Sequence, residues 1–162
     1  MPPTPNLQVA AALTGRFTKR AVRRSWPELD VIRKRIGCCE PGEAVVAGAG
    51  RLPATYIFHT VGPRFRDGSQ GEPLILEHCY RTCLRLAREL DVKVISVPSI
   101  STGVYGYPVE QAAEIAVRAV TSALKTNPGP LRVVKLVQFN DRDSSIYAEA
   151  ARQIVGNFAS AG

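Results

Sequence analysis

Residues 92–108 read Val-Lys-Val-Ile-Ser-Val-Pro-Ser-Ile-Ser-Thr-Gly-Val-Tyr-Gly-Tyr-Pro. The first six residues are mostly β-branched and apolar, which predicts a short buried strand at 92–97. The glycines that follow predict a loop. Apolar residues then recur at helical spacing over 108–124, which predicts a helix. A strand that leads through a glycine-containing loop into a helix is the building unit of an α/β sheet.

Strands and helices alternate on both sides of this unit. Further strands are predicted at 44–47, 56–61 and 131–139, and further helices at 18–24, 27–37, 74–90 and 144–158, the last one capped by Asp143 or Ser144. The apolar segment 7–13 is too short for its pattern to separate strand from helix. We therefore expect the α/β class, with βαβ crossovers and an at least partly parallel sheet.

Composition predicts one ordinary domain over residues 1–162. The chain has 162 residues, of which 45% are hydrophobic and 22% charged, as in a globular protein with one core. Residues 1–6 are expected to be a loose tail. No apolar run reaches the roughly 18 residues that a membrane span needs. The first residues lack the basic-then-apolar order of a secretory signal. We expect a cytoplasmic protein with no membrane partner.

Positive charge is concentrated in the segment 16–35, which holds eight basic and two acidic residues within a chain of net charge +7. Such a patch attracts phosphate groups. The pattern leaves open whether the partner is a nucleic acid, poly(ADP-ribose) or a nucleotide, or whether the segment is only a solvated helix face.

The cysteines and His59 do not form a metal-binding or catalytic pattern. Cys38 and Cys39 are adjacent, and Cys79 and Cys83 are spaced as two small apolar residues on one helix face. This is no zinc-ribbon spacing, and no metal or cofactor is expected. His59 stands within a predicted strand without a Ser–His–acid pattern, which favours a structural role.

The loop after the strand at 92–97 has the features of an anion site. Gly103 and Gly106 let the backbone approach a ligand and turn its N–H groups toward an anion. The start of the next helix adds partial positive charge. Ser101 and Thr102 offer hydroxyl groups, and Tyr105 offers a flat face for a sugar or a base.

Three further segments make the pattern specific to a family. The loop closely resembles the second phosphate-binding loop of the macrodomain family, whose members bind ADP-ribose or process Appr-1″-p. The family's other strands are similar to Gly-Glu-Ala-Val-Val at 42–46, Leu-Pro-Ala-Thr-Tyr-Ile-Phe-His-Thr-Val-Gly-Pro at 52–63 and Leu-Val-Gln-Phe-Asn-Asp at 136–141. The resemblance covers about residues 27–157, in colinear order.

The resemblance implies a three-layer α/β/α fold with a mixed, largely parallel central sheet and a cleft for ADP-ribose. The backbone of the loop would surround the diphosphate and the distal ribose, through Ser101, Thr102, Gly103, Val104, Tyr105 and Gly106. Tyr105 would pack on that ribose. Either Phe139 or Asn140 would lie near the adenine, where an aromatic ring could stack and an amide could only hydrogen-bond.

The N-terminal part, residues 7–26, departs from the family pattern. Counting back from Gly42 aligns residues 15–18 with the first phosphate loop, so Gly15 and Phe17 are expected to contact the ligand. Arg16 replaces a glycine there, and Thr18 stands where the hydrolase branch has a catalytic Asp. The segment 9–12 lacks the Asn of the family's second strand. The catalytic residues therefore stay unknown, and the segment is either truncated or divergent.

We expect the segment 7–13 to occupy the position of that second strand, because an empty position would leave backbone groups of its neighbours unpaired. The expected function is binding of ADP-ribose or ADP-ribosylated protein, with binding favoured over turnover. Hydrolysis of ADP-ribosylated protein or O-acetyl-ADP-ribose is left open. The alternative is a basic module that binds nucleic acid or poly(ADP-ribose) through 16–35 without catalysis.

Overall fold

The computed structural model describes residues 39–49 and 54–159. Its elements in chain order are β1 (Ala44–Gly48), β2 (Tyr56–Thr60), α3 (Glu72–Glu89), β3 (Val94–Pro98), α4 (Val109–Thr126), β4 (Val133–Val137) and α5 (Asp141–Ala159). Each strand and helix predicted within the described ranges is present, and the α/β class is confirmed. The predictions for 7–13, 18–24 and 27–37, and for the basic patch 16–35, lie outside the described residues.

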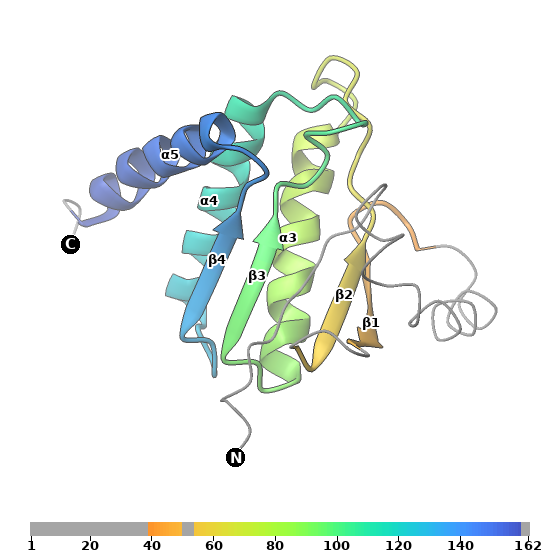
Figure 1. The fold of residues 1–162 in the computed structure, drawn as a ribbon, viewed down its shortest axis with the longest axis vertical. Coiled ribbons are helices and arrows are strands. Elements are labelled where there is room, and N and C mark those ends of the chain that lie inside the picture. Colours follow the sequence, from red (N-terminus) through yellow and green to blue (C-terminus); the bar gives the residue numbers. More distant parts are fainter. Residues whose placement is uncertain (1–38, 50–53, 160–162) are drawn as a thin grey trace.

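The described strands form two ladders. β1 pairs antiparallel with β2, with Val46 opposite Phe58, and β3 pairs parallel with β4, with Ser96 opposite Lys135. β2, β3 and β4 run in the same direction and β1 in the opposite one (Figure 1). The carboxyl ends of β2, β3 and β4 therefore lie at the same edge, where ligands bind in open α/β sheets.

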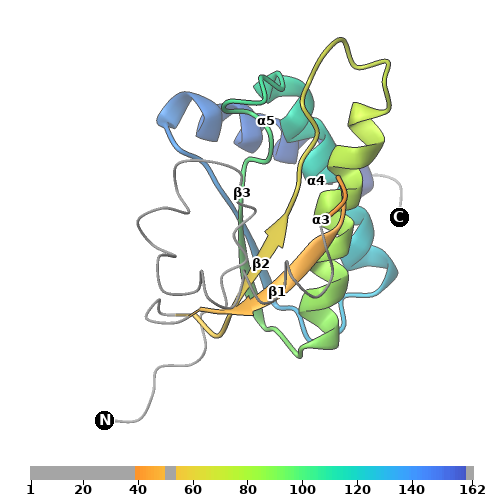
Figure 2. The same ribbon diagram turned by 90° about the vertical axis from the view of Figure 1, so that its right-hand side faces the viewer.

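Helices α3 and α4 cover one face of the strands, and α5 packs against α4 (Figure 2). A single hydrophobic core joins β2, α3, β3, α4 and α5; its buried residues include Phe58, Leu76, Tyr80, Ile95, Ala116 and Tyr147. α4 contributes mainly alanines to this core, which lets it lie close to α3. None of the helices in the described ranges is long and apolar enough to cross a lipid bilayer.

The cysteines of α3 behave as predicted for small apolar residues. Cys79 and Cys83 are both buried in the core. Burial raises the pKa of Cys83 to about 12, so this thiol stays neutral at physiological pH. A buried neutral thiol is unreactive, and the two residues serve packing.

The predicted start of the last helix was wrong. α5 begins at Asp141 rather than Ser144, and Asn140 caps it in place of Asp143 or Ser144. The Oδ1 atom of Asn140 accepts a hydrogen bond of 2.8 Å from the Asp143 N–H. The Asn140 side-chain amide nitrogen in turn donates a hydrogen bond of 3.0 Å to the Asp143 carboxylate. Asn140 is therefore the N-cap, because its side chain accepts from a backbone N–H of the first turn that has no partner within the helix. Asp143 lies inside that turn.

Candidate functional site

The loop between β3 and α4 contains two residues with a left-handed backbone. It leaves β3 at the carboxyl edge and passes through two left-handed residues, Ser101 (φ 66°) and Gly106 (φ 68°). It ends at α4, whose first turn has no side-chain cap within the described chain. The uncapped N–H groups and the helix dipole give this end partial positive charge.

The amide groups of the loop are left available. The loop is closed by the Gly106 N–H donating to the Gly103 carbonyl at 2.9 Å and the Tyr107 N–H donating to the Ser101 carbonyl at 3.0 Å. Within residues 39–49 and 54–159 the N–H groups of the four residues between, 102–105, have no acceptor. Val104 at the tip is 87% exposed. Adjacent amides without an acceptor are groups that can donate to a phosphate.

Side chains from α3 and α5 form hydrogen bonds with residues at the start of the loop. The Thr102 hydroxyl donates to Ser99 Oγ at 2.7 Å, and Ser99 Oγ is hydrogen-bonded to the Tyr147 hydroxyl at 2.9 Å. The Ile100 N–H donates to the Tyr80 hydroxyl at 3.3 Å. Burial raises the pKa of Tyr147, and it raises that of Tyr80 well above its ordinary value. Both hydroxyl groups therefore stay protonated at neutral pH.

The segment after β2 forms a second wall beside the loop. The Phe65 N–H donates to the Tyr105 carbonyl at 2.9 Å, and the Arg64 guanidinium lies 5.4 Å from the centre of the Tyr105 ring. A Cβ atom on Gly62 would stand 2.2 Å from Ser101 Oγ. The backbone of this segment thus approaches the loop so closely that only glycine fits there.

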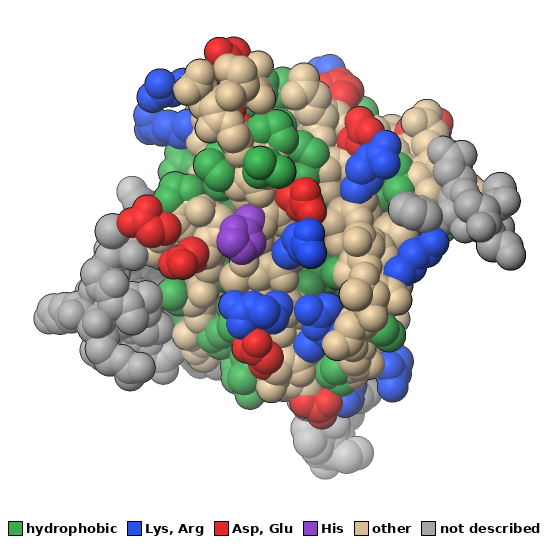
Figure 3. Space-filling view, turned by 180° about the vertical axis from the view of Figure 1, so that it is seen from behind, with side chains coloured by type: hydrophobic (Ala, Val, Ile, Leu, Met, Phe, Trp, Pro, Cys, Tyr) green, Lys and Arg blue, Asp and Glu red, His purple; other side chains and the backbone are tan. Residues whose placement is uncertain are grey.

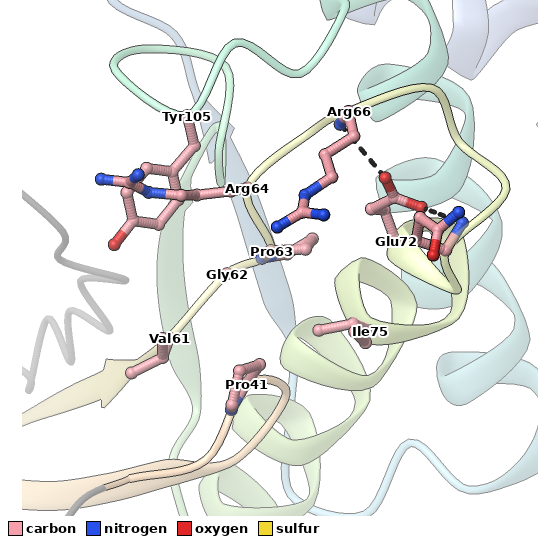
Figure 4. Close-up of a pocket in the computed structure, with 10 residues that line it drawn as sticks. Pro41, Val61, Gly62, Pro63, Arg64, Arg66, Glu72, Ile75 and Tyr105 are labelled. Atoms are coloured by element: carbon pink, nitrogen blue, oxygen red, sulfur yellow. Dashed lines mark hydrogen bonds between the residues drawn. The ribbon is translucent and has the colours of Figure 1, made fainter.

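A pocket of about 360 Å³ opens between this segment and the start of α3 (Figure 4). Its walls come from Pro41, the segment 61–64, Arg66, the first turns of α3 and Tyr105. The residue Glu72 is 3% exposed. Its carboxylate accepts hydrogen bonds from the backbone N–H groups of Arg66 at 3.1 Å and of Gln70 at 2.7 Å. Burial opposes its ionisation, but these hydrogen bonds prevail and lower the pKa of Glu72.

The remaining candidate residues are only partly brought together. Phe139 follows β4 and is 80% exposed, whereas the Asn140 side chain is engaged in capping α5. Gly15 and Phe17 lie outside the described residues. His59 is half-buried in β2, and burial lowers its pKa. A neutral histidine in a strand agrees with the structural role expected of it.

The prediction from sequence overlooked Arg66 and Tyr147. Arg64 and Arg66 alternate in the sequence after the strand motif, a pattern that could have indicated a charged wall. Tyr147 lies on a helix 48 residues from Ser99, and no local pattern marks it.

The comparison with known families agrees with this geometry. The model of the Macro domain family matches residues 6–116, which is more than half of the chain. The chain belongs to the Macro domain family.

This macrodomain has relatives with sequence identities above 40%. It is 45% identical over 127 residues to a Macro domain-containing protein of Caldanaerobacter subterraneus subsp. tengcongensis, covering 78% of this chain and 71% of the relative. It is 42% identical over 120 residues to O-acetyl-ADP-ribose deacetylase 1 of Pantoea vagans, covering 74% and 70%.

Among solved structures, this macrodomain is similar to a mutant of the Oceanobacillus iheyensis macrodomain with ADPR. The TM-score is 0.82 at 30% identity, and the likeness covers 92% of this chain and 87% of the other.

Proposed function

We propose that this macrodomain binds ADP-ribose, free or attached to protein, through Ser101, Thr102, Gly103, Val104, Tyr105 and Gly106. The observation that carries the proposal is the row of amides at 102–105, which have no acceptor in the described chain. A diphosphate would accept from these amides, and the start of α4 would stabilise its charge. The names of the deacetylase relative and the ADPR-bound neighbour support the same ligand.

The rest of the ligand would extend along the carboxyl edge of the strands. Tyr105 would pack on the distal ribose, and Phe139, which is 80% exposed beyond β4, would stack on the adenine. Asn140 would contribute only through its backbone, because its side chain caps α5. Gly15 and Phe17 stay in the proposal on the sequence resemblance alone.

The proposed activity is binding rather than fast turnover. Thr18 stands where the hydrolase branch has an Asp, and the segment 9–12 contains no Asn. A hydrolytic step depends on groups that position the water and the ribose. Incubation with O-acetyl-ADP-ribose and detection of released acetate tests this part. Release at the rate of an active deacetylase would show that other residues supply the missing groups.

Gly103→Glu is expected to abolish ADP-ribose binding measured by calorimetry. A Cβ at Gly103 meets no atom within 4 Å, and its φ is not in the left-handed region, so the variant should fold. A carboxylate about 4 Å from a phosphate, at an effective dielectric constant of about 20, costs about 4 kcal/mol. We therefore expect at least about a 100-fold loss of affinity.

The matched control is Gly156→Glu, which adds the same charge at an equally open glycine on α5. It should bind ADP-ribose as the wild type does. Equal affinity of the Gly103→Glu variant and the wild type would remove the loop from the proposed site. Failure of the wild type to bind ADP-ribose at all would refute the function.

The basic patch 16–35 remains a second proposal, for nucleic acid or poly(ADP-ribose). It predicts affinity that falls steeply with salt and depends little on the sequence of the polyanion. We also propose a cytoplasmic location, supported by the free cysteines Cys39, Cys79 and Cys83, which suit a reducing compartment. Cell fractionation tests that location.

A further inference from the structure

The pocket beside the loop is lined by two arginines, Arg64 and Arg66, and by one carboxylate, that of Glu72. The guanidinium groups of Arg64 and Arg66 make no ion pair and no hydrogen bond with any residue in the described ranges. Figure 4 shows the Arg66 side chain pointing from the loop after β2 into the pocket, while the Arg64 guanidinium lies over Tyr105. Both arginines thus line the pocket, and the Arg66 side chain points into it.

The carboxylate that lines the pocket forms no ion pair with either guanidinium group. Both oxygens of Glu72 already accept backbone N–H groups, from Arg66 and from Gln70. The carboxylate therefore holds the backbone of the wall in place, and the Glu72 residue is buried. An anion that enters the pocket would meet guanidinium groups that have no ion pair and no hydrogen bond within the described residues.

Arginines elsewhere on the described surface are arranged differently. On α3 and α4 each of three arginines is paired with a glutamate four residues away: Arg81–Glu77, Arg85–Glu89 and Arg118–Glu114. Figure 3 shows basic and acidic side chains interspersed over this helical face. Arg88 and Arg132 have no acidic partner either, but both donate to backbone carbonyls. Among the arginines of the described residues, only Arg64 and Arg66 therefore have a guanidinium group with neither an ion pair nor a hydrogen bond.

The pocket also adjoins the end of the proposed ligand to which a polypeptide would be joined. Tyr105 belongs to both the loop and the pocket wall, and it is the residue proposed to pack on the distal ribose. A group attached to that ribose would then lie near the pocket wall to which Tyr105 belongs. We propose, on the basis of the proposed ADP-ribose function, that the pocket binds a carboxylate side chain of the polypeptide that carries the ADP-ribose.

The composition of the pocket favours an acidic side chain over a nucleic acid. Pro41, Pro63 and Ile75 give it apolar walls that suit the methylene groups of a glutamate, while guanidinium groups pair well with carboxylates. One face of the Tyr105 ring is covered by Arg64. In the part of the chain that the structure describes, the pocket lining thus offers no open aromatic platform of the kind that single-stranded nucleic acids use.

The test compares three ligands by calorimetry. They are free ADP-ribose, a peptide carrying ADP-ribose through a non-hydrolysable linkage and flanked by glutamates, and the same peptide with glutamines in place of the glutamates. The wild type should bind the acidic peptide about five-fold more tightly than the neutral one, since Arg66 is exposed and its ion pair is screened by solvent. Arg66→Gln should remove this difference and leave the affinity for free ADP-ribose unchanged.

The matched control is Arg81→Gln, which removes the same charge from α3 at a position already paired with Glu77; it should keep the preference. Equal binding of both peptides by the wild type would overturn the inference, and so would an Arg66→Gln variant that keeps the preference. An Arg66-dependent preference for ADP-ribosylated RNA over the acidic peptide would also overturn it. Binding of free ADP-ribose in these experiments would leave the proposed function intact, whereas its absence would refute both.

Discussion

Because Gly62 has no side chain, the segment after β2 can lie directly against the loop between β3 and α4, and the two form one site. Ser101, whose side chain lies against Gly62, has a left-handed backbone and is only 7% exposed. An ordinary side chain at position 62 would displace it. The geometry of the amides at 102–105 therefore depends on a residue outside their own loop.

Gly62→Ala is expected to destabilise the fold by about 1–3 kcal/mol, as overpacking usually does, and to weaken ADP-ribose binding. The added Cβ would meet Ser101 Oγ at 2.2 Å and Ile100 Cγ2 at 2.6 Å, so the start of the loop must move. Urea unfolding and calorimetry measure the two effects. Gly156→Ala, at an open helical position, should instead stabilise by about 0.5–1 kcal/mol. Unchanged stability and affinity in Gly62→Ala would show that the loop yields without cost.

The glycines of the loop were predictable from sequence, because a glycine pattern between a strand and a helix is a local signal. The roles of Gly62 and Tyr147 were not predictable in this way. Each acts on the loop from a segment far away in the chain, 48 residues in the case of Tyr147 and Ser99. Only the packing of the elements brings such residues together.

At the scale of elements, α3 and α5 hold the strand-to-helix loop in place. Tyr80 from α3 and Tyr147 from α5 reach the loop through Ile100 and Ser99. The periodicity of apolar residues predicted both helices, but it could not predict their ends. α5 starts at Asp141 because Asn140 caps it, and several polar residues near that position had equal claims in the sequence.

Tyr147→Phe is expected to lower the affinity for ADP-ribose several-fold, with a loss of folding stability of about 1 kcal/mol for the hydroxyl. Without this hydroxyl, Ser99 loses its partner on α5 and Thr102 is held less firmly. Calorimetry on the variant and on Tyr56→Phe gives the comparison. Tyr56 lies on β2 away from this network, and its variant should bind as the wild type does. Equal affinity of all three proteins would show that the loop is ordered without α5.

At the scale of the whole molecule, the core joins both ladders to one set of helices, so that the fold should respond to pH as a unit. The chain carries 21 basic against 14 acidic residues, and lowering the pH adds further positive charge. One group with a shifted pKa, the His59 side chain in β2, titrates near neutrality in the unfolded chain. The position of His59 in a strand was predictable from sequence, whereas its burial depends on tertiary packing that no local pattern shows.

Lowering the pH from about 7 to about 5 should destabilise the protein through His59. Burial lowers the pKa of His59 below its ordinary value of about 6.5. Its Nε2 atom is buried and has no hydrogen-bond partner in the described chain. The unfolded chain thus takes up the proton at higher pH than the folded chain. The contribution of His59 to the free energy of unfolding is complete above the pKa that it has in the unfolded chain. This contribution is lost as the pH falls from that value toward the lower pKa of His59 in the folded chain.

Urea unfolding at both pH values, on the wild type and on His59→Gln, measures this effect. The wild type should lose more free energy of unfolding on acidification than the variant does. His78→Gln, at an exposed position on α3, should follow the wild type. The same loss in wild type and His59→Gln would assign the acid sensitivity to the carboxyl groups instead.

The hydrogen bond from the Phe65 N–H to the Tyr105 carbonyl has a thermodynamic consequence. It ties the amides proposed for the diphosphate to the arginine-bearing wall, so that fixing one of them reduces the freedom of the other. Two ligand fragments that occupy the two regions would then show positive cooperativity, each bound more tightly in the presence of the other. By reciprocity, the gain measured for the nucleotide must equal the gain measured for the peptide.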